Sequence, residues 1–226
     1  MQTGWEFESL KKPNELQNIV IRPILKNDLD AVMQIEEEAW PIEARAPRNK
    51  FEERLKVFPL GFKVAALNCK IVCVTTSQII YYDPKNPPSS WTEITNDGHI
   101  SETHKENGNA LYVVSIGVSP RGKPDGRSIG VGTKLLESQK LLVKDLNLQY
   151  LVLSARVPGY DSYCKSRGNI DIETYVNLRR KEDNLPEDIE LRFYERAGLR
   201  QVKICPNTMD DIESRNYGVM MEWKVK

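Results

Sequence analysis

The arrangement of apolar and polar positions predicts a β–loop–α–β unit in the middle of the chain. Residues 111–118 are almost all apolar, as expected for a buried strand, and the segment from about Val131 to Leu146 has the periodicity of an amphipathic helix. A second apolar run, 149–156, follows directly. Because a helix joins the two runs, we expect them to form neighbouring parallel strands with a right-handed crossover.

Shorter patterns on both sides of this unit predict the rest of the fold. Apolar runs bounded by turn residues predict strands, and capped or proline-initiated segments with apolar positions three or four residues apart predict helices. The expected strands outside the central unit are 19–23, 62–67, 70–81, 199–205 and 217–224, and the expected helices are about 28–40, 47–58, 172–181 and 188–197. Together these elements predict an α/β (α+β) fold with a mixed sheet of about seven strands.

The same patterns divide the chain into a polar N-terminal extension, 1–18, and a single domain, 19–226. Two insertions interrupt the domain: 83–109, which is rich in Pro, Ser, Asn and Gly and contains both histidines, and 161–188. Long insertions in a compact domain are often functional. We therefore expect these two segments to build the substrate pocket.

Charge and hydropathy exclude several classes of protein. The 32 acidic and 32 basic residues balance, so no overall field favours nucleic acid or an anionic membrane. No apolar run approaches the roughly 18 residues that cross a bilayer, and the N-terminus lacks the basic and apolar regions of a signal peptide. We expect a cytoplasmic protein without nucleic-acid or membrane partners.

The four cysteines predict no metal centre. They lack the paired C-x-x-C motifs of zinc sites, and we expect them to be reduced, with a metal or redox role as the alternative. Asn68-Cys69 is the expected turn of a hairpin. The even separation of Cys69 and Cys73 would direct both side chains to one face if a single strand contained them.

A phosphate site is predicted by the loop that ends in Arg127-Ser128-Ile129-Gly130-Val131-Gly132-Thr133. Two glycines let backbone N–H groups approach a phosphate closely, and the first turn of the following helix supplies unpaired donors. The preceding stretch from Gly117 nearly matches the P-loop, but Pro124 supplies no hydroxyl for magnesium. The dinucleotide fingerprint fails as well. It requires a third glycine and an acidic residue at the end of the next strand, and this chain has neither.

Two motifs resemble the GCN5-related N-acetyltransferase (GNAT) superfamily. The turn that begins at Arg127 matches the family's acetyl-coenzyme A signature, Q/R-x-x-G-x-G/A, and the stretch Phe193-Tyr194-x-x-x-Gly198-Leu199 is similar to its later F-Y-x-x-x-G-F motif. They occur in the family's order, about 60 residues apart, within a predicted mixed sheet. The resemblance covers 19–224.

A looser similarity connects the chain with a GNAT subgroup that includes acetyltransferase-like domains fused to carbon–nitrogen hydrolases. It rests on Arg156-Val157-Pro158-Gly159-Tyr160 after the fifth strand, on Pro206-Asn207 and Asp210-Asp211, and on the closing stretch 217–223. This similarity implies no particular substrate.

The GNAT resemblance implies a mostly antiparallel sheet that splays between its fourth and fifth strands, with acetyl-coenzyme A as cosubstrate and no metal. Pantetheine would lie along Ile116, Gly117 and Val118 and pair with backbone groups of Ile116 and Val118. The pyrophosphate would be bound by the main chain of Arg127, Ser128, Ile129, Gly130, Val131, Gly132 and Thr133. Two features depart from the family: the loop after Pro120 is about four residues longer, and Arg156 stands where many members have an Asn.

The resemblance further implies transfer of an acetyl group to a primary amine of a small molecule or protein, by direct attack in a ternary complex. Tyr194 lies where many members keep the acid that protonates the departing thiolate; a packed aromatic is the alternative role. The residues leave the general base open, with Glu36, His104, Glu93 and a water chain as candidates. Tyr160 is a candidate for the acceptor pocket.

Two further alternatives stay open at the level of sequence. A chain with this fold could be a non-catalytic coenzyme A-binding or sensing module rather than an enzyme. Members of the family often pair through their C-terminal strands, so a homodimer is an alternative to a monomer.

Overall fold

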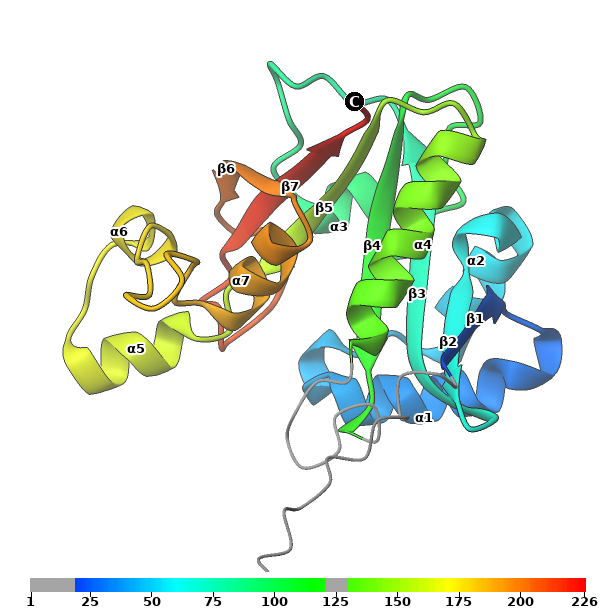
Figure 1. Cartoon of the computed structure of the whole chain (residues 1–226), viewed down its shortest axis with the longest axis horizontal. Coiled ribbons are helices and arrows are strands. Elements are labelled where there is room, and N and C mark those ends of the chain that lie inside the picture. The colour runs from blue at the N-terminus through cyan, green and yellow to red at the C-terminus, as the bar shows by residue number, and fades with distance from the viewer. Residues whose placement is uncertain (1–18, 121–129) are drawn as a thin grey trace, which may run out of the picture.

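The computed structural model describes residues 19–120 and 130–226, which form a seven-stranded sheet with helices on both faces (Figure 1). The strand order is β1-β2-β3-β4-β5-β7-β6, and every neighbouring pair is antiparallel except β4 and β5. The strands are β1 Ile19–Pro23, β2 Lys63–Leu67, β3 Lys70–Ile80, β4 Ala110–Val118, β5 Tyr150–Arg156, β6 Arg200–Cys205 and β7 Gly218–Lys224. The expected mixed, mostly antiparallel sheet is confirmed.

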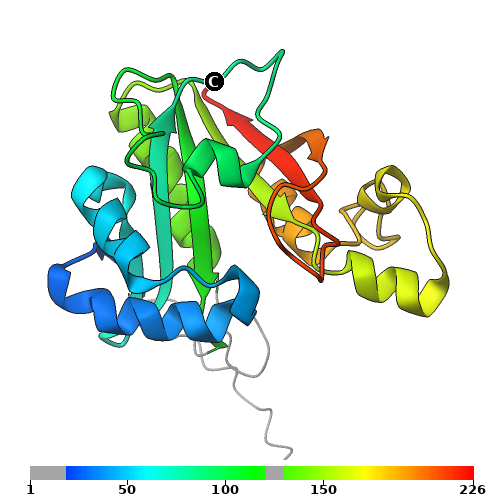
Figure 2. The ribbon, with the colours of Figure 1, turned by 180° about the vertical axis from the view of Figure 1, so that it is seen from behind.

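Helices cover the two faces unequally. Figure 1 shows α4, Val131–Asp145, and α7, Ile189–Arg196, in front of the sheet. The opposite face, seen in Figure 2, carries α1, Leu29–Ala39, α2, Arg48–Val57, and α3, Trp91–Thr95. The remaining elements are α5 Tyr160–Arg167, α6 Ile172–Val176, and the 3-10 turns η2 Lys26–Asp28, η3 Ile42–Ala44 and η4 Pro59–Gly61. Within the described ranges no helix is long and apolar enough to cross a membrane.

The apolar stripes of α4 and α1 explain their positions on the sheet. Val131 and Leu135 of α4 are fully buried against β3, whereas Val32 and Ile35 of α1 are fully buried on the other face. Burying one such side chain contributes about 1.5–3 kcal/mol of hydrophobic stabilisation. The two stripes therefore fix α4 and α1 on opposite sides of β3.

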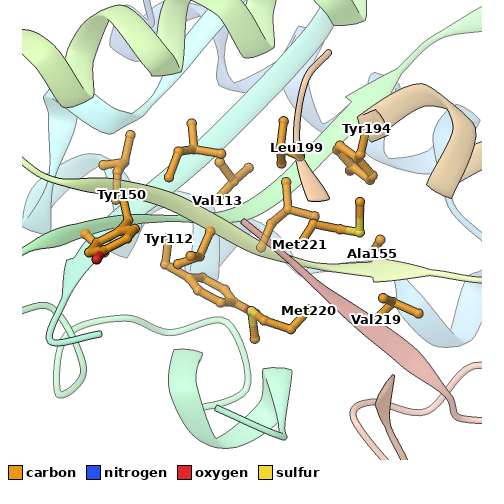
Figure 3. Packing of buried hydrophobic residues seen from close by; sticks show 14 of the residues in the cluster. Tyr112, Val113, Tyr150, Ala155, Tyr194, Leu199, Val219, Met220 and Met221 are labelled. Atoms are coloured by element: carbon orange, nitrogen blue, oxygen red, sulfur yellow. The ribbon is translucent and has the colours of Figure 1, made fainter. Parts of the chain in front are cut away.

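A second part of the core lies around β5 and β7. Figure 3 shows Tyr112 and Met220 on one side of these strands, and Tyr194 and Leu199 on the other. The alternation of side chains along a strand produces this division. Tyr194 belongs to α7, which packs on the same side of the sheet as α4.

β4 and β5 pair only at one end. Ala110, Leu111 and Tyr112 pair with Tyr150, Leu151 and Val152. Beyond these pairs β4 continues along β3 and β5 continues along β7, and Figure 1 shows the two strands diverging. A register shift leaves Val114 as an extra residue on β4, and such a bulge bends its strand. The expected splay between the fourth and fifth strands is confirmed.

The two insertions differ in detail from the predictions. Within 83–109, which we expected to be a loop, α3 forms because the Ser90 side chain accepts a hydrogen bond from the Glu93 N–H at its start. In 161–188 the sequence pattern gave no indication of α5, and the expected helix 172–181 ends at Val176. The chain turns back there, and Arg179 pairs with Pro186 across an isolated bridge.

Cys69 and Cys73 do not share a face, so that prediction is wrong. β3 begins at Lys70, which leaves exposed Cys69 in the turn with a φ of +65° and buried Cys73 inside the strand. Asn68 has a φ of +50°, and two successive positive φ values are typical of a tight hairpin turn. The expected hairpin is therefore present, and none of the four cysteines forms a disulfide.

Candidate active site

A cleft of about 690 Å³ opens where β4 and β5 diverge. Its walls come from α1, η3 and α2 on one side and from β5, α7 and the segment 206–217 on the other. Residues Val113 to Ile116 of β4 also line it. Of the two insertions expected to build the substrate pocket, 83–109 contributes Trp91, Thr92 and Asp97 to this cleft, whereas 161–188 contributes no lining residue.

The outer edge of β4 presents backbone groups toward the gap left by β5. The Ser119 N–H donates to the Val72 carbonyl at 2.9 Å. Backbone groups alternate in direction along an antiparallel ladder, so Gly117 faces β3. Those of Ile116 and Val118 therefore face away from β3, where no strand of the described residues pairs with them.

The start of α4 lies beside the end of β4. Gly130, the residue preceding the helix, has a φ of +80°, a conformation that favours glycine. The Lys134 N–H donates to the Gly130 carbonyl, which leaves the first-turn N–H groups of the helix directed out of its end. A Cβ on Gly132 would lie 3.5 Å from side-chain atoms of Val118 and Phe193, an ordinary contact distance.

The expected phosphate loop lies partly outside and partly within the described residues. Arg127, Ser128 and Ile129 lie outside the described residues. Gly130, Val131, Gly132 and Thr133 lie within them, at the start of α4.

Tyr194 lines the cleft from α7 and is 8% exposed. Burial raises the pKa of its phenol well above the usual value, with a further contribution from the carboxyl group of Glu190. The phenol is therefore protonated at neutral pH. No described residue hydrogen-bonds to its hydroxyl, and the Phe193 ring packs edge-on against its ring at a centroid distance of 4.9 Å.

Glu190 lies one helical turn before Tyr194 and lines the same cleft. The Asp188 side chain fixes this turn by accepting hydrogen bonds from the N–H groups of Glu190 and Leu191. The Glu190 side chain is 28% exposed, through the cleft, although protein surrounds it. Burial raises its pKa to about 7; Arg156 opposes the increase, and nearby Asp188 adds to it.

Arg156, at the end of β5, is committed to other acidic side chains. Its guanidinium donates two hydrogen bonds to buried Asp211, at 2.7 and 2.8 Å, and a third to Glu213 at 2.7 Å. Glu190 lies 3.7 Å away. This network connects β5 with the segment 206–217 and with α7.

Arg54, on α2, is the most deeply buried cation of the cleft, at 1% exposed. Its Nε donates to the Gly98 carbonyl at 2.8 Å, and its Nη1 lies 3.3 Å from the Thr76 hydroxyl. Burial lowers its pKa to about 10, so the guanidinium stays charged at neutral pH. Its Nη2 makes no hydrogen bond with the described residues.

Glu36 lines the cleft from α1, on the side opposite α4. It is 3% exposed, its Oε1 accepts a hydrogen bond from the Ala46 N–H at 2.7 Å, and its Oε2 has no partner among the described residues. Burial raises the pKa of this carboxyl group, opposed by the Ala46 hydrogen bond and the charge of Arg54. Trp40, one turn later, has an indole Nε1 that is likewise buried without a partner in the described part of the chain.

Three other residues named from the sequence are not brought to the cleft. His104 stacks on Phe58, and its Nδ1 accepts a hydrogen bond from the Ile79 N–H at 3.1 Å. Burial lowers its pKa. Glu93 lies on α3 but does not line the cleft, and the Tyr160 hydroxyl donates to the Ile170 carbonyl at 2.8 Å.

Glu190 and Arg54 are cleft residues that reasoning from the sequence missed. Glu190 had a usable signal, because the spacing of four residues to Tyr194 puts both on one face of a helix. Arg54 had none, since its burial depends on a carbonyl 44 positions later in the chain. No group of His, Cys, Asp and Glu side chains suited to a metal occurs in the ranges 19–120 and 130–226.

Comparisons with known proteins identify relatives and fold neighbours. The uncharacterized N-acetyltransferase YkwB of Bacillus subtilis (strain 168) is 30% identical over 214 residues, which cover 93% of this chain and 90% of YkwB. The probable hydrolase YhcX of the same organism is 27% identical over 208 residues, which cover 92% of this chain and 39% of YhcX. No model of a protein family matches the sequence.

Among solved structures, the GphF GNAT-like decarboxylase in complex with isobutyryl-CoA superposes with a TM-score of 0.73 at 24% identity, over 91% of this chain and 98% of that one. This similarity concerns the fold. With the YkwB match and the splayed seven-stranded sheet, it shows that the chain belongs to the GNAT superfamily. The match to part of YhcX fits the looser similarity to acetyltransferase-like domains joined to hydrolases.

Proposed function

We propose that this protein is an acetyltransferase that moves an acetyl group from acetyl-coenzyme A to a primary amine. The observation that carries the proposal is the combination, at one cleft, of an open strand edge on β4 with Tyr194 and Glu190 on α7. YkwB, similar over nearly its whole length, is named an N-acetyltransferase, which supports the same reaction class.

The cosubstrate would bind along β4 and the start of α4. Backbone groups of Ile116 and Val118, on either side of Gly117, would pair with the pantetheine amides as a neighbouring strand does. The pyrophosphate would be bound by N–H groups at the start of α4, where the helix dipole favours an anion. The proposed pyrophosphate residues are Arg127, Ser128, Ile129, Gly130, Val131, Gly132 and Thr133.

The chemistry needs a base for the ammonium group and an acid for the sulfur. Glu190, with a pKa of about 7, would accept the proton of the substrate ammonium, directly or through water. The amine nitrogen then attacks the thioester carbonyl carbon, and the C–N bond forms to give a tetrahedral intermediate. Its nitrogen loses a second proton to solvent as the C–S bond breaks, and solvent later reprotonates Tyr194. Tyr194, protonated because burial raises its pKa, would donate its proton to the leaving thiolate.

The test measures the release of coenzyme A thiol from acetyl-coenzyme A with a panel of primary amines. We expect release that depends on the amine, together with acetylated product detected by mass spectrometry. Tight binding of acetyl-coenzyme A without turnover of any amine would instead support a non-catalytic coenzyme A-binding module.

A second candidate reaction is decarboxylation of a carboxylated acyl-coenzyme A. Buried Arg54 favours it, because its Nη2 has no hydrogen bond within the described residues and a guanidinium is a strong binder of carboxylates. The GphF neighbour is named a decarboxylase. Amine-independent release of CO₂ from malonyl-coenzyme A would favour this reaction over acetyl transfer.

A further inference from the structure

Two of the four cations that line the cleft are neutralised by ion pairs within the protein. Lys50 pairs with Asp97 at 2.7 Å, and Arg156 pairs with Asp211 at 2.7 Å. Arg45 is exposed, and its guanidinium donates to the backbone carbonyl groups of Trp40 and Glu37. Arg54 is therefore the one lining cation, among the described residues, that has neither an ion pair within 4 Å nor a position on the exposed rim.

Two exposed acidic groups of the cleft have no such partner within the described ranges. Glu43 of η3 and Asp210 of the segment 206–217 are exposed lining residues, and neither forms an ion pair or a side-chain hydrogen bond within the described ranges. They lie on different walls of the cleft. The exposed guanidinium of Arg45 offsets one of these two carboxylates, so the entrance carries a net negative charge, which attracts cations.

Glu36 adds an acidic group inside the cleft. It is 3% exposed, and its Oε2 is buried without a partner in the described part of the chain. A buried carboxylate oxygen without a hydrogen bond is unfavourable, so a ligand that donates to it recovers free energy. Arg54 acts on Glu36 through its charge but lies beyond ion-pair distance.

From this charge distribution we infer that the acceptor is a small aliphatic amine with a second ammonium group, and that Glu36 binds this second group. The inference rests on the proposed function, since it names the class of amine. The reacting nitrogen is handled by Glu190 on α7, whereas Glu36 lies across the cleft on α1. A diamine or polyamine supplies one nitrogen to each.

The experiment compares two amines of equal length, 1,5-diaminopentane and pentylamine, in the acetyl-coenzyme A assay. We expect kcat/KM to be at least tenfold higher for the diamine. Glu36→Gln should raise KM for the diamine at least tenfold, with little change in kcat and little change in either constant for pentylamine. This substitution keeps the shape of the side chain and the Oε1 acceptor of the Ala46 N–H.

Glu37→Gln is the matched control, because Glu37 is an exposed carboxylate on the same helix and does not line the cleft. It should leave the preference for the diamine intact. Equal kcat/KM values for the two amines, or an unchanged diamine KM in Glu36→Gln, would overturn the inference while the proposed function stands.

Failure of the proposed function has a different signature: neither amine releases coenzyme A. In that case calorimetric titration of the coenzyme A-bound protein with both amines still decides the inference. A diamine affinity at least tenfold above that of pentylamine, lost in Glu36→Gln, supports the binding role of Glu36; equal affinities refute it.

Discussion

At the scale of single residues, the site depends on how burial raises the pKa values of two neighbouring side chains of α7, Glu190 and Tyr194. Loss of water disfavours the charged form of both, which keeps Tyr194 protonated and brings the pKa of Glu190 to about 7. Near neutral pH Tyr194 can therefore donate a proton, and the deprotonated fraction of Glu190 can accept one. One physical cause prepares both roles.

Tyr194→Phe should lower kcat by about 10²-fold, the usual order for loss of a general acid. Its effect on the free energy of unfolding should be small, because no described residue hydrogen-bonds to the hydroxyl that is removed. Steady-state kinetics and urea denaturation measure the two effects. An unchanged kcat would leave Tyr194 only the role of a packed aromatic.

The rate of acetyl transfer should rise with pH through about 7, because Glu190 must be deprotonated to accept a proton and its carboxyl group is protonated below that value. The log of kcat against pH should have a slope near +1 below the pKa and level off above it. Glu190→Gln should remove this limb and lower kcat. If the limb persists in the variant, it belongs to another group.

Sequence patterns could name those candidate site residues that belong to local motifs, and missed the cleft residues that depend on tertiary contacts. Gly130, Gly132 and Tyr194 could be named because strand, turn and helix signals surround them. His104 was named for its closeness to β4 along the chain, yet it stacks on Phe58. Arg54 was unpredictable, since a polar position on a short helix is normally solvated, and this side chain is enclosed by groups distant in sequence, among them the Gly98 carbonyl and the Thr76 hydroxyl.

At the scale of elements, the junction of β4 and α4 places the proposed pantetheine site next to the proposed pyrophosphate site. Strand prediction was accurate here because the sheet buries continuous apolar runs, whereas the ends of α3 and α6 depend on caps and bridges formed by distant segments. The two glycines at the start of α4 differ in whether the backbone requires a glycine at their position. Gly130 needs its positive φ, while Gly132 could accommodate a methyl group.

Gly132→Glu should reduce coenzyme A affinity at least 100-fold, because it places a negative charge and a bulky side chain where the pyrophosphate is proposed to bind. Gly132→Ala is the folding control: its Cβ would make ordinary contacts, and alanine is favourable within a helix. Calorimetric titration with coenzyme A measures both affinities. Equal affinity of the glutamate variant and the unchanged protein would contradict the proposed phosphate site.

At the scale of the whole molecule, one ion-pair network connects distant parts of the chain. Arg156 on β5 bonds Asp211 and Glu213 of the segment 206–217, which in turn lines the cleft. Asp211 is 1% exposed, so its carboxylate is stable there only beside the guanidinium. The side wall of the cleft therefore depends on a buried charge pair.

Asp211→Ala should lower the free energy of unfolding by about 3–5 kcal/mol, because it leaves the mostly buried Arg156 without its principal partner. Asp210→Ala, at the exposed neighbouring position, should change stability by about 0.5 kcal/mol or less. Urea denaturation of both variants provides the comparison. Equal stability of the two would show that Glu213 and solvent compensate for the lost pair.

The short pairing of β4 with β5 has a mechanical consequence. The blocks β1–β4 and β5–β7 share a seam of three residue pairs, reinforced by the Tyr112 hydroxyl and the Ser154 Oγ at 3.0 Å. A cosubstrate bound along β4 would lengthen that seam and couple the two blocks more tightly. Amide hydrogen exchange should then slow on coenzyme A binding in β5 and β7 as well as in β4, so ligand occupancy would be felt as rigidity across the sheet.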